Sequence, residues 1–484
     1  MINETPRVRF APSPTGYLHV GGLRTALYNF LFAKNNRGKF ILRIEDTDRN
    51  RYVEGAVENL INALKWCRLD YDEGPEKGGE FGPYMQSERL DIYKKYAAEL
   101  IQKGKAYYAF DTPERLAQLK EEQTSRKEQS KYDKLALTLS QEEIKQKLES
   151  GEPYVIRLNV TPGQRVLVDD VIRGRVEFNT DVVDDQILIK SDGYPTYHMA
   201  NVVDDHLMKI THVIRGEEWL SSTPKHVLLY EYFGWEIPVF AHLPLLLNPD
   251  KSKLSKRQGD VAVEDYRAKG YLKEALVNFV ALLGWNAGDD KEFYNYEELI
   301  NNFSLDRVNK SGAVFNVEKL DWLNGEHIRS KNSNELLPLF KEELSKSKYH
   351  EQNYSDEHLL KIIDAMKERI IFVHELIDKS PYFFERPDSY EEKAVQKRWK
   401  PETPEELSKL LIAFENLQTP AKEEFENALH KTAEELGIGN GKLIHPLRLA
   451  VSGTSTGPGM FDLLTILGKD EVTERIKIAL EKIK

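Results

Sequence analysis

Residues 9–22, Arg-Phe-Ala-Pro-Ser-Pro-Thr-Gly-Tyr-Leu-His-Val-Gly-Gly, constrain the fold of this 484-residue chain more than any other stretch. The residues just before them are typical of the end of a buried strand. Pro12 and Pro14 stop that strand, because proline has a fixed φ and no backbone N–H. Beyond the glycine pair, apolar residues recur at helical spacing. The stretch therefore predicts a strand, a rigid turn and a helix, with His19 at the helix start.

A helix start of this composition suits a phosphate group. Its unpaired backbone N–H groups and the positive end of the helix dipole attract anions. Gly21 and Gly22 have no side chains, so a nucleotide can approach the backbone closely, and His19 can donate a hydrogen bond to a phosphate oxygen. The alternative is a strand–helix turn with a surface histidine, and a lone His-Val-Gly-Gly would favour that alternative.

A second, basic stretch lies far downstream. Lys253, Lys256 and Arg257 supply three cations within five residues. Cations placed on a transferring phosphate chain stabilise charge in the transition state. Alone, such a pentapeptide is most often a solvated loop. Together, the two stretches predict the halves of one ATP site, in which His19, Lys253, Lys256 and Arg257 are the candidate catalytic residues.

The two stretches resemble the two signature motifs of class I aminoacyl-tRNA synthetases, and the full pattern resembles the bacterial type of the glutamyl-tRNA synthetase family. Four further blocks are similar to that family and follow its order, at residues 40–48, 191–198, 213–219 and 315–320. The first motif ends in Gly22, where many class I enzymes carry a second histidine, and this departure is common in the glutamyl branch. The resemblance runs from about residue 7 to the C-terminus.

Composition agrees with a chain of several domains, with 40% hydrophobic and 30% charged residues. No apolar run is long enough to cross a bilayer, and the N-terminus lacks a signal-peptide pattern, so we expect no membrane and a cytoplasmic location. Cys67 is the only cysteine, which excludes an internal disulfide and argues against a structural zinc. We expect no metal site apart from the Mg²⁺ that accompanies ATP. The net charge of −11 argues against non-specific nucleic-acid binding.

Alternating strand and helix patterns predict an α/β fold. We expect a class I Rossmann-type parallel-sheet catalytic domain at residues 1–90 and 194–257. An α+β domain that binds the tRNA acceptor end is inserted at 91–193. A helical connecting domain that contacts the tRNA stem follows at 258–327, and an all-α anticodon-binding domain at 328–484. The functions of the last three domains are implied by the resemblance.

Some individual elements can be placed from periodicity. Residues 39–44 and 243–247 are predicted strands, and residues 272–283 and 359–376 are predicted helices.

Two arginines are suited to an acidic substrate, because guanidinium binds carboxylate through two parallel bonds. Arg9 precedes the phosphate turn and Arg215 ends a later strand, so both are placed at the strand ends where ligands of parallel sheets bind. The resemblance assigns Arg9 and Arg215 to the side-chain carboxylate of L-glutamate and Glu45 to its ammonium. In the alternative, Glu45 forms a surface salt bridge with Arg43 or Arg49.

The resemblance implies the remaining contacts. Those to glutamate are Ala11, Ser13, Tyr197 and Asn201. Those to ATP are Thr15, Gly21, Gly22, Glu218 and Trp219. Those to the anticodon are Arg369, Arg448, Pro458, Met460 and Phe461. Pro458, Met460 and Phe461 could wedge against unstacked bases, or equally be a helix–helix turn and core residues.

The implied activity is attachment of L-glutamate to the 3′ end of tRNA(Glu) through a glutamyl-adenylate, by a monomeric ligase that serves protein synthesis. A glutaminyl-tRNA synthetase is the nearest rival, but it typically carries Glu where this chain has Ser13. Other rivals are a truncated relative that glutamylates a modified tRNA base, and a tRNA-binding regulator that has lost catalysis. Whether the glutamine tRNA is also charged stays open, and Arg369 matches a position that favours strict selection.

Overall fold

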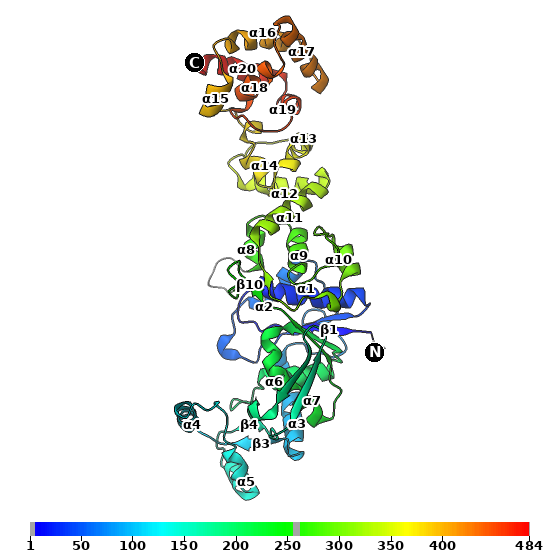
Figure 1. The fold of residues 1–484 in the computed structure, drawn as a ribbon, viewed down its shortest axis with the longest axis vertical. Coiled ribbons are helices and arrows are strands. Elements are labelled where there is room, and N and C mark those ends of the chain that lie inside the picture. Colours follow the sequence, from blue (N-terminus) through cyan, green and yellow to red (C-terminus); the bar gives the residue numbers. More distant parts are fainter. Residues whose placement is uncertain (1–4, 255–261, 484) are drawn as a thin grey trace. The chain divides into compact units, whose positions relative to one another are not determined.

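The computed structural model describes residues 5–254 and 262–483, which form two compact units. The first, here the α/β unit, comprises the described residues up to 269 together with 273–317. The second, here the helical unit, comprises residues 270–272 and 318–483. Figure 1 shows strands and helices mixed in the α/β unit, whereas the helical unit contains helices.

The N-terminal strand, turn and helix have the predicted order. Strand β1 (Arg7–Phe10) leads into helix α1 (Val20–Asn35), and His19 is the N-cap residue of that helix. Strand β2 (Lys39–Leu42) then pairs in parallel with β1 in the register Arg7↔Lys39 to Phe10↔Leu42. The prediction from the proline-rich turn and the glycine pair is therefore confirmed.

A four-stranded sheet lies beside β1, in the order β6-β5-β9-β8. Strands β8 (His212–Gly216) and β9 (Val239–Leu243) are parallel, and β9 is also parallel to β5 (Arg165–Asp170). Strand β6 (Gly174–Asn179) forms an antiparallel hairpin with β5. This hairpin comes from the segment between residues 91 and 193, yet it extends the sheet formed by β8 and β9.

The rest of that segment forms a smaller sheet of its own. Its antiparallel strands, in the order β3-β4-β7, are β3 (Ala106–Ala109), β4 (Val155–Leu158) and β7 (Ile187–Ile189). Helices α4 (Pro113–Ser125) and α5 (Gln141–Glu149) lie between β3 and β4 in sequence and bury no residue. Figure 1 shows both helices beside this sheet.

The remaining helices and strands of the α/β unit are α2 (Ala56–Trp66), α3 (Leu90–Gln102), α6 (Tyr197–Leu207), α7 (Thr223–Phe233), β10 (Leu246–Leu247), α8 (Val263–Ala268), α9 (Lys273–Ala281), α10 (Tyr296–Asn302) and β11 (Ala313–Val314). Helices α9 and α10 pack against α1 (Figure 1).

The strand predicted at 243–247 is interrupted. Strand β9 ends at Leu243, and β10 pairs in parallel with β11 instead. Pro244 separates the two strands because it has no N–H for a ladder, and its carbonyl accepts a hydrogen bond from the Arg24 guanidinium.

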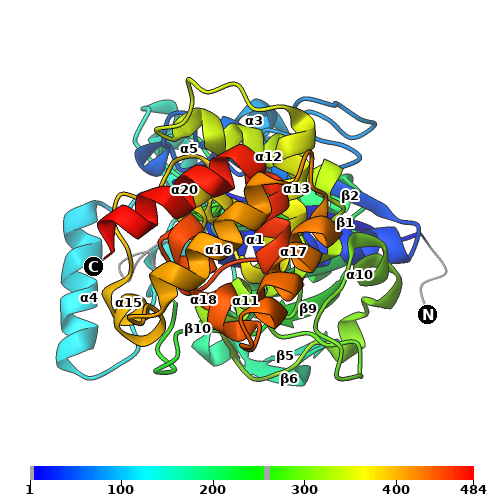
Figure 2. The same cartoon turned by 90° about the horizontal axis from the view of Figure 1, so that it is seen from above.

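The helical unit is built from ten helices in its described residues: α11 (Val317–Ser330), α12 (Ser333–Lys346), α13 (Asp356–Met366), α14 (Glu375–Asp378), α15 (Glu392–Arg398), α16 (Thr403–Glu415), α17 (Lys422–Glu435), α18 (Gly441–Ser452), α19 (Met460–Leu467) and α20 (Lys469–Lys482). Helices α16, α18 and α20 pack on one another, as Figure 2 shows.

The helix predicted at 359–376 is two helices. Helix α13 ends at Met366, and Ile370 is extended at φ −114° and ψ 151°. The Glu375 carboxylate accepts hydrogen bonds from the backbone N–H groups of Ile371 at 2.6 Å and Phe372 at 3.3 Å. These bonds satisfy donors that a continuous helix would have paired with carbonyls, so the chain can turn there and begin α14.

Two residues of α16 give a matched test of the helical core. Leu410 is fully buried, whereas the side chain of Ile412 is 59% exposed. Leu410→Ala is expected to lower the free energy of unfolding by about 2–5 kcal/mol, because it leaves a cavity, and Ile412→Ala by less than about 0.5 kcal/mol. Urea denaturation of the full chain, followed by circular dichroism, measures both. Equal losses would show that the core of this unit is not centred on Leu410.

Candidate active site

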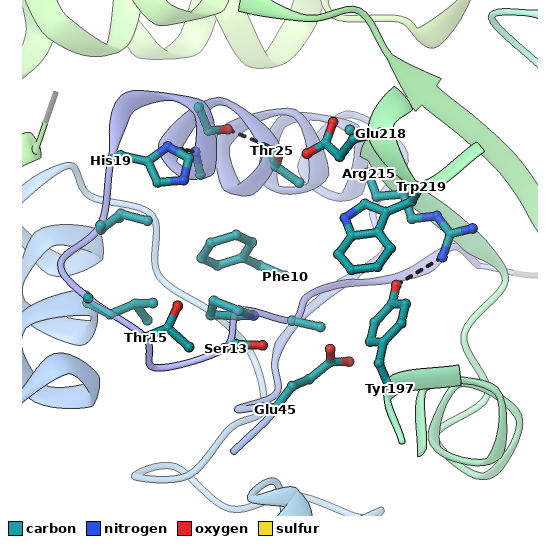
Figure 3. A pocket seen from close by; sticks show the side chains of 18 of the residues that line it. Phe10, Ser13, Thr15, His19, Thr25, Glu45, Tyr197, Arg215, Glu218 and Trp219 are labelled. Carbon is teal, nitrogen blue, oxygen red and sulfur yellow. Dashed lines mark hydrogen bonds between the residues drawn. The ribbon is translucent and has the colours of Figure 1, made fainter. Parts of the chain in front are cut away.

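A cavity of about 840 Å³ opens at the carboxyl ends of β1 and β8. It is lined by every predicted site residue that falls among the described residues of the α/β unit: Arg9, Ala11, Ser13, Thr15, His19, Gly21, Gly22, Glu45, Tyr197, Asn201, Arg215, Glu218, Trp219 and Lys253. Lys256 and Arg257 lie outside the described residues. In Figure 3, His19 and Thr15 lie on one side of the cavity and Tyr197, Trp219 and Arg215 on the other.

His19 lies where a phosphate-binding residue is expected. It is exposed, and its Nδ1 accepts a hydrogen bond of 3.1 Å from the Gly22 N–H. A neutral imidazole that accepts at Nδ1 carries its proton on Nε2, so the ring presents a donor there. A Cβ at Gly21 would lie only 3.1 Å from the His19 ring, and a Cβ at Gly22 only 2.8 Å from Leu18. Both glycines thus keep the helix start open.

Two basic side chains share one acidic residue of α6 behind the cavity. Arg9 donates to both carboxylate oxygens of Asp205, at 3.0 and 3.2 Å, and Arg43 donates to the same carboxylate at 2.8 Å. All three side chains are buried. Burial alone would raise the pKa of Asp205, but the two guanidinium groups outweigh it and hold that pKa below its ordinary value. Asp205 is therefore ionised and fixes the orientation of Arg9.

Glu45 belongs to the same buried network. Its Oε1 accepts hydrogen bonds from Arg43 at 3.1 Å and from the Asn201 amide at 3.4 Å. Glu45 does pair with Arg43, but the pair is buried and lines the cavity, so the alternative of a surface salt bridge is wrong. Burial is the largest influence on Glu45 and raises its pKa, although Arg43 and Arg9 act in the opposite direction.

Arg215 has different partners from Arg9. Its guanidinium donates to His242 Nε2 at 3.1 Å, to the Tyr197 hydroxyl at 3.0 Å and to the Thr223 hydroxyl at 3.0 Å, and it lies 3.2 Å from His226 Nδ1. Within the described ranges no carboxylate forms an ion pair with Arg215. Its charge therefore remains available to an anionic ligand in the cavity.

Trp219 and Glu218 come from a short 3-10 helix at Glu217–Ser222, directly after β8. The Trp219 ring lies 4.3 Å from the Tyr197 ring, centroid to centroid, and its side chain is 37% exposed. Figure 3 shows Trp219 beside Arg215 and Tyr197, facing the open cavity. An exposed aromatic face in this position can receive a flat ring such as a nucleobase.

The residues predicted to contact an anticodon lie in the helical unit. Arg369 donates to the Gly457 carbonyl at 3.0 Å, and Arg448 lies against the same glycine. Pro458 and Met460 are buried, and Phe461 is half-buried. Arg369, Arg448 and the 457–461 segment are thus brought together, while Pro458 and Met460 occupy core positions.

Sequence reasoning missed the polar residues that hold the two arginines, chiefly Asp205, His242 and Asp170. A weak pattern pointed to Asp205, because it follows Asn201 by one helical turn and so shares its face of α6. His242 and Asp170 carried no such local pattern, since each becomes meaningful only when β9 and β5 lie beside β8.

Comparisons with known proteins cover the whole chain. Residues 6–322 match the family of class I tRNA synthetases (E and Q), catalytic domain, and residues 334–480 match an anticodon-binding domain family. A glutamate–tRNA ligase of Chloroherpeton thalassium is 54% identical over 100% of this chain and 99% of its own, and one of Chlorobium chlorochromatii is 53% identical with the same coverage.

A crystal structure of a glutamate tRNA ligase from Elizabethkingia meningosepticum, in complex with its amino acid, matches with a TM-score of 0.94 and 45% identity, over 99% of this chain and 100% of that one. In residues 5–254 and 262–483, no helix has the length and apolar character needed to span a bilayer.

The shared carboxylate of Asp205 predicts a large, pH-dependent contribution to stability. Asp205→Asn is expected to destabilise the protein by about 3–5 kcal/mol at pH 7, because two buried guanidinium groups lose their counter-charge. A depressed pKa in the folded state contributes stability above the unfolded pKa of about 3.9, and this stability is lost as the pH falls through the folded value.

The difference in melting temperature between wild type and Asp205→Asn should therefore be full at pH 7 and shrink below about pH 4. Thermal denaturation across this pH range measures it, with the exposed Asp169→Asn as the control. A difference that does not change with pH would contradict the assigned ionisation.

Proposed function

Since the chain belongs to the class I tRNA synthetases of the E and Q family, we propose that it is a glutamate–tRNA ligase that joins L-glutamate to tRNA(Glu) at the expense of ATP. Two family matches that together span residues 6–322 and 334–480 support the proposal, as do ligases of this name that are more than 50% identical over the full chain. One observation carries the proposal. A single cavity contains both the start of α1, which can bind a phosphate group, and Arg215, a buried arginine without an ion pair among the described residues.

The amino acid occupies the side of the cavity formed by β8 and α6. Arg215 receives the side-chain carboxylate, because its described partners are neutral and its charge is not otherwise matched. Arg9 adds a second positive group whose orientation Asp205 fixes. The buried carboxylate of Glu45 faces the substrate ammonium. Ala11, Ser13, Tyr197 and Asn201 complete this part of the lining.

The nucleotide occupies the side formed by the start of α1. The backbone near Gly21 and the Nε2 donor of His19 hold phosphate oxygens, and Gly22, whose N–H is bonded to His19 Nδ1, leaves room for the phosphates. Thr15, Glu218 and Trp219 line the space left for the nucleoside. Lys253 lines the cavity and contributes a cation, and Lys256 and Arg257, outside the described residues, are proposed to add two more.

The first step is attack of the substrate α-carboxylate on the α-phosphorus of ATP. A carboxylate O–P bond forms, the bond from the α-phosphorus to the bridging oxygen breaks, and glutamyl-adenylate and pyrophosphate result. The nucleophile is already ionised, so these residues position the reactants and stabilise the leaving charge. Mg²⁺ would be bound mainly by the phosphate oxygens of ATP and would neutralise part of their charge. The described residues contain no group of three or more acidic, histidine or cysteine side chains that could hold the ion.

A terminal ribose hydroxyl of the tRNA then attacks the mixed anhydride and releases AMP. We assign the acceptor end to the insertion at 91–193, the stem to 258–327 and the anticodon to 328–484, with Arg369, Arg448, Pro458, Met460 and Phe461 as candidate anticodon contacts. The proposed Rossmann-type catalytic domain comprises 1–90 and 194–257, and the β5–β6 hairpin of the inserted segment adds two strands to its sheet. We further propose a cytoplasmic monomer without structural zinc.

Pyrophosphate exchange measures the first step directly. Purified full-length protein is assayed with ATP and either glutamate or glutamine, with and without tRNA(Glu). Exchange with glutamate, and greater exchange when tRNA is present, is the expected result. Exchange with glutamine alone would favour the glutaminyl rival, and no exchange with either amino acid would favour a tRNA-binding protein without catalysis.

Arg215→Gln separates the two halves of the cavity. The change removes the charge that faces the side-chain carboxylate, and truncating one partner of a buried charge pair costs about 2–5 kcal/mol. The KM for glutamate is therefore expected to rise by about 30-fold or more, while the KM for ATP changes little. Steady-state exchange kinetics measure both constants, and the exposed Arg175→Gln is the control. Equal losses for both substrates would contradict the assignment.

A further inference from the structure

Three adjacent strands place a chain of polar groups behind Arg215. Arg215 on β8 and His242 on β9 are direct partners in the parallel register, and Arg215 Nε donates to His242 Nε2 at 3.1 Å. On the other side of the ring, His242 Nδ1 lies 2.6 Å from Asp170 Oδ2, at the end of β5. Arg215, His242 and Asp170 are 5%, 0% and 4% exposed. The chain is therefore fully internal and ends at the cavity.

The hydrogen bonds of Asp170 fix the tautomer of His242. Asp170 accepts backbone N–H bonds from Ile172 at 2.9 Å, Arg173 at 2.8 Å and His242 at 3.1 Å. An ionised carboxylate only accepts, so the short contact to His242 requires a proton on Nδ1. Nε2 then has a lone pair, which is what the Arg215 Nε–H needs.

The acid–base properties of both groups agree with this arrangement. Burial lowers the pKa of His242 in spite of the neighbouring Asp170 carboxylate. Burial acts to raise the pKa of Asp170, but the bonds from His242 and the backbone outweigh it, so that pKa lies below its ordinary value. A neutral imidazole thus separates an anion from a cation.

The positive charge of Arg215 has no carboxylate in direct contact with it among the described residues. The anion of this chain, Asp170, is separated from Arg215 by the His242 ring. Arg9 uses two guanidinium N–H groups to bind Asp205. Among the described residues, Arg215 instead contacts the neutral side chains of His242, Tyr197, Thr223 and His226. These four contacts use four of the five N–H groups of a guanidinium, and one N–H of Nη2 remains. That group is a donor only, so it attracts a carboxylate and repels the NH₂ of a carboxamide.

We infer that Asp170 and His242 are positioning residues which hold Arg215 as a carboxylate receptor and thereby set the preference for glutamate over glutamine. This inference rests on the proposed ligase function. It assigns a role in substrate selection to two residues that do not touch the substrate. One of them, Asp170, is the last residue of β5, where the turn to β6 begins.

Asparagine at position 170 separates this role from a merely structural one. Its amide oxygen can still accept the backbone bonds of the turn, but its NH₂ then faces His242 Nδ1. The ring has to accept at Nδ1 and carry its proton on Nε2, which places a donor against the Arg215 Nε–H. Replacing the aspartate partner of a histidine by asparagine is known to invert the tautomer while the geometry persists.

The experiment is pyrophosphate exchange with tRNA present, on full-length wild type and Asp170→Asn. The variant is expected to raise the KM for glutamate by about 10- to 100-fold, to leave the KM for ATP within about twofold, and to lower the ratio of kcat/KM for glutamate over glutamine. Loss of folded protein lowers the apparent kcat and leaves KM unchanged, so the split between the two KM values reports positioning.

Matched variants provide the controls. Asp169→Asn makes the same change one residue earlier, on the exposed face where Asp169 pairs with Arg175, and is expected to behave as wild type. His242→Gln offers an amide oxygen to Arg215 and an amide N–H to Asp170, so it is expected to keep most of the glutamate preference. His242→Leu can do neither and is expected to lose it.

The outcomes are distinguishable. Wild type that does not exchange with glutamate would overturn the proposed function together with this inference. Active wild type, with a glutamate KM in Asp170→Asn equal to that in Asp169→Asn, would overturn the inference alone. If Asp170→Asn does not fold, the comparison of His242→Gln with His242→Leu decides, and equal glutamate KM values in these two would also overturn it.

Discussion

One buried carboxylate holds together the side of the cavity that β1 and α6 form. Asp205, on α6, is bonded to Arg9 on β1 and to Arg43, which directly follows β2, so a single side chain ties three elements that are far apart in sequence. Buried charges are tolerated only when they are paired and hydrogen-bonded. Arg43 also donates a hydrogen bond to the Glu45 carboxylate. The positions of Arg9 and Glu45, the two charged residues of this network that line the cavity, therefore depend on Asp205.

Arg215, the second arginine of the cavity, is held by neutral side chains and, within the described part of the chain, by no carboxylate. Arg9 is neutralised by direct contact, whereas Arg215 is surrounded by hydroxyl groups and histidines, and its nearest anion in this chain of bonds is one imidazole away. The first arrangement gives rigidity and the second keeps charge available. A site that must bind an anion reversibly benefits from having both, because a fully neutralised pocket would not attract it and an unsupported guanidinium would not stay in place.

Local sequence predicted the parts that depend on neighbours along the chain. Pro12, Pro14 and the glycine pair act on their immediate neighbours, so the strand, turn and helix could be predicted from them, and the predicted lining residues follow from that segment and from the resemblance. Asp170 and His242 are 72 residues apart in the sequence, and neither lies in a local sequence pattern that indicates its role. The break at Ile370 was missed for a related reason, since periodicity continues across it and only the bonds from Glu375 reveal the turn.

The hairpin of β5 and β6 joins the sheet next to β9, and its turn begins at Asp170. The cavity is therefore connected, through Arg215 and His242, to a segment whose outward-facing residues are exposed. Drift in that hairpin, whether natural or selected in the laboratory, can retune which amino acid is accepted without altering any atom that meets it. Efforts to recode this protein should accordingly include the hairpin turn among the randomised positions.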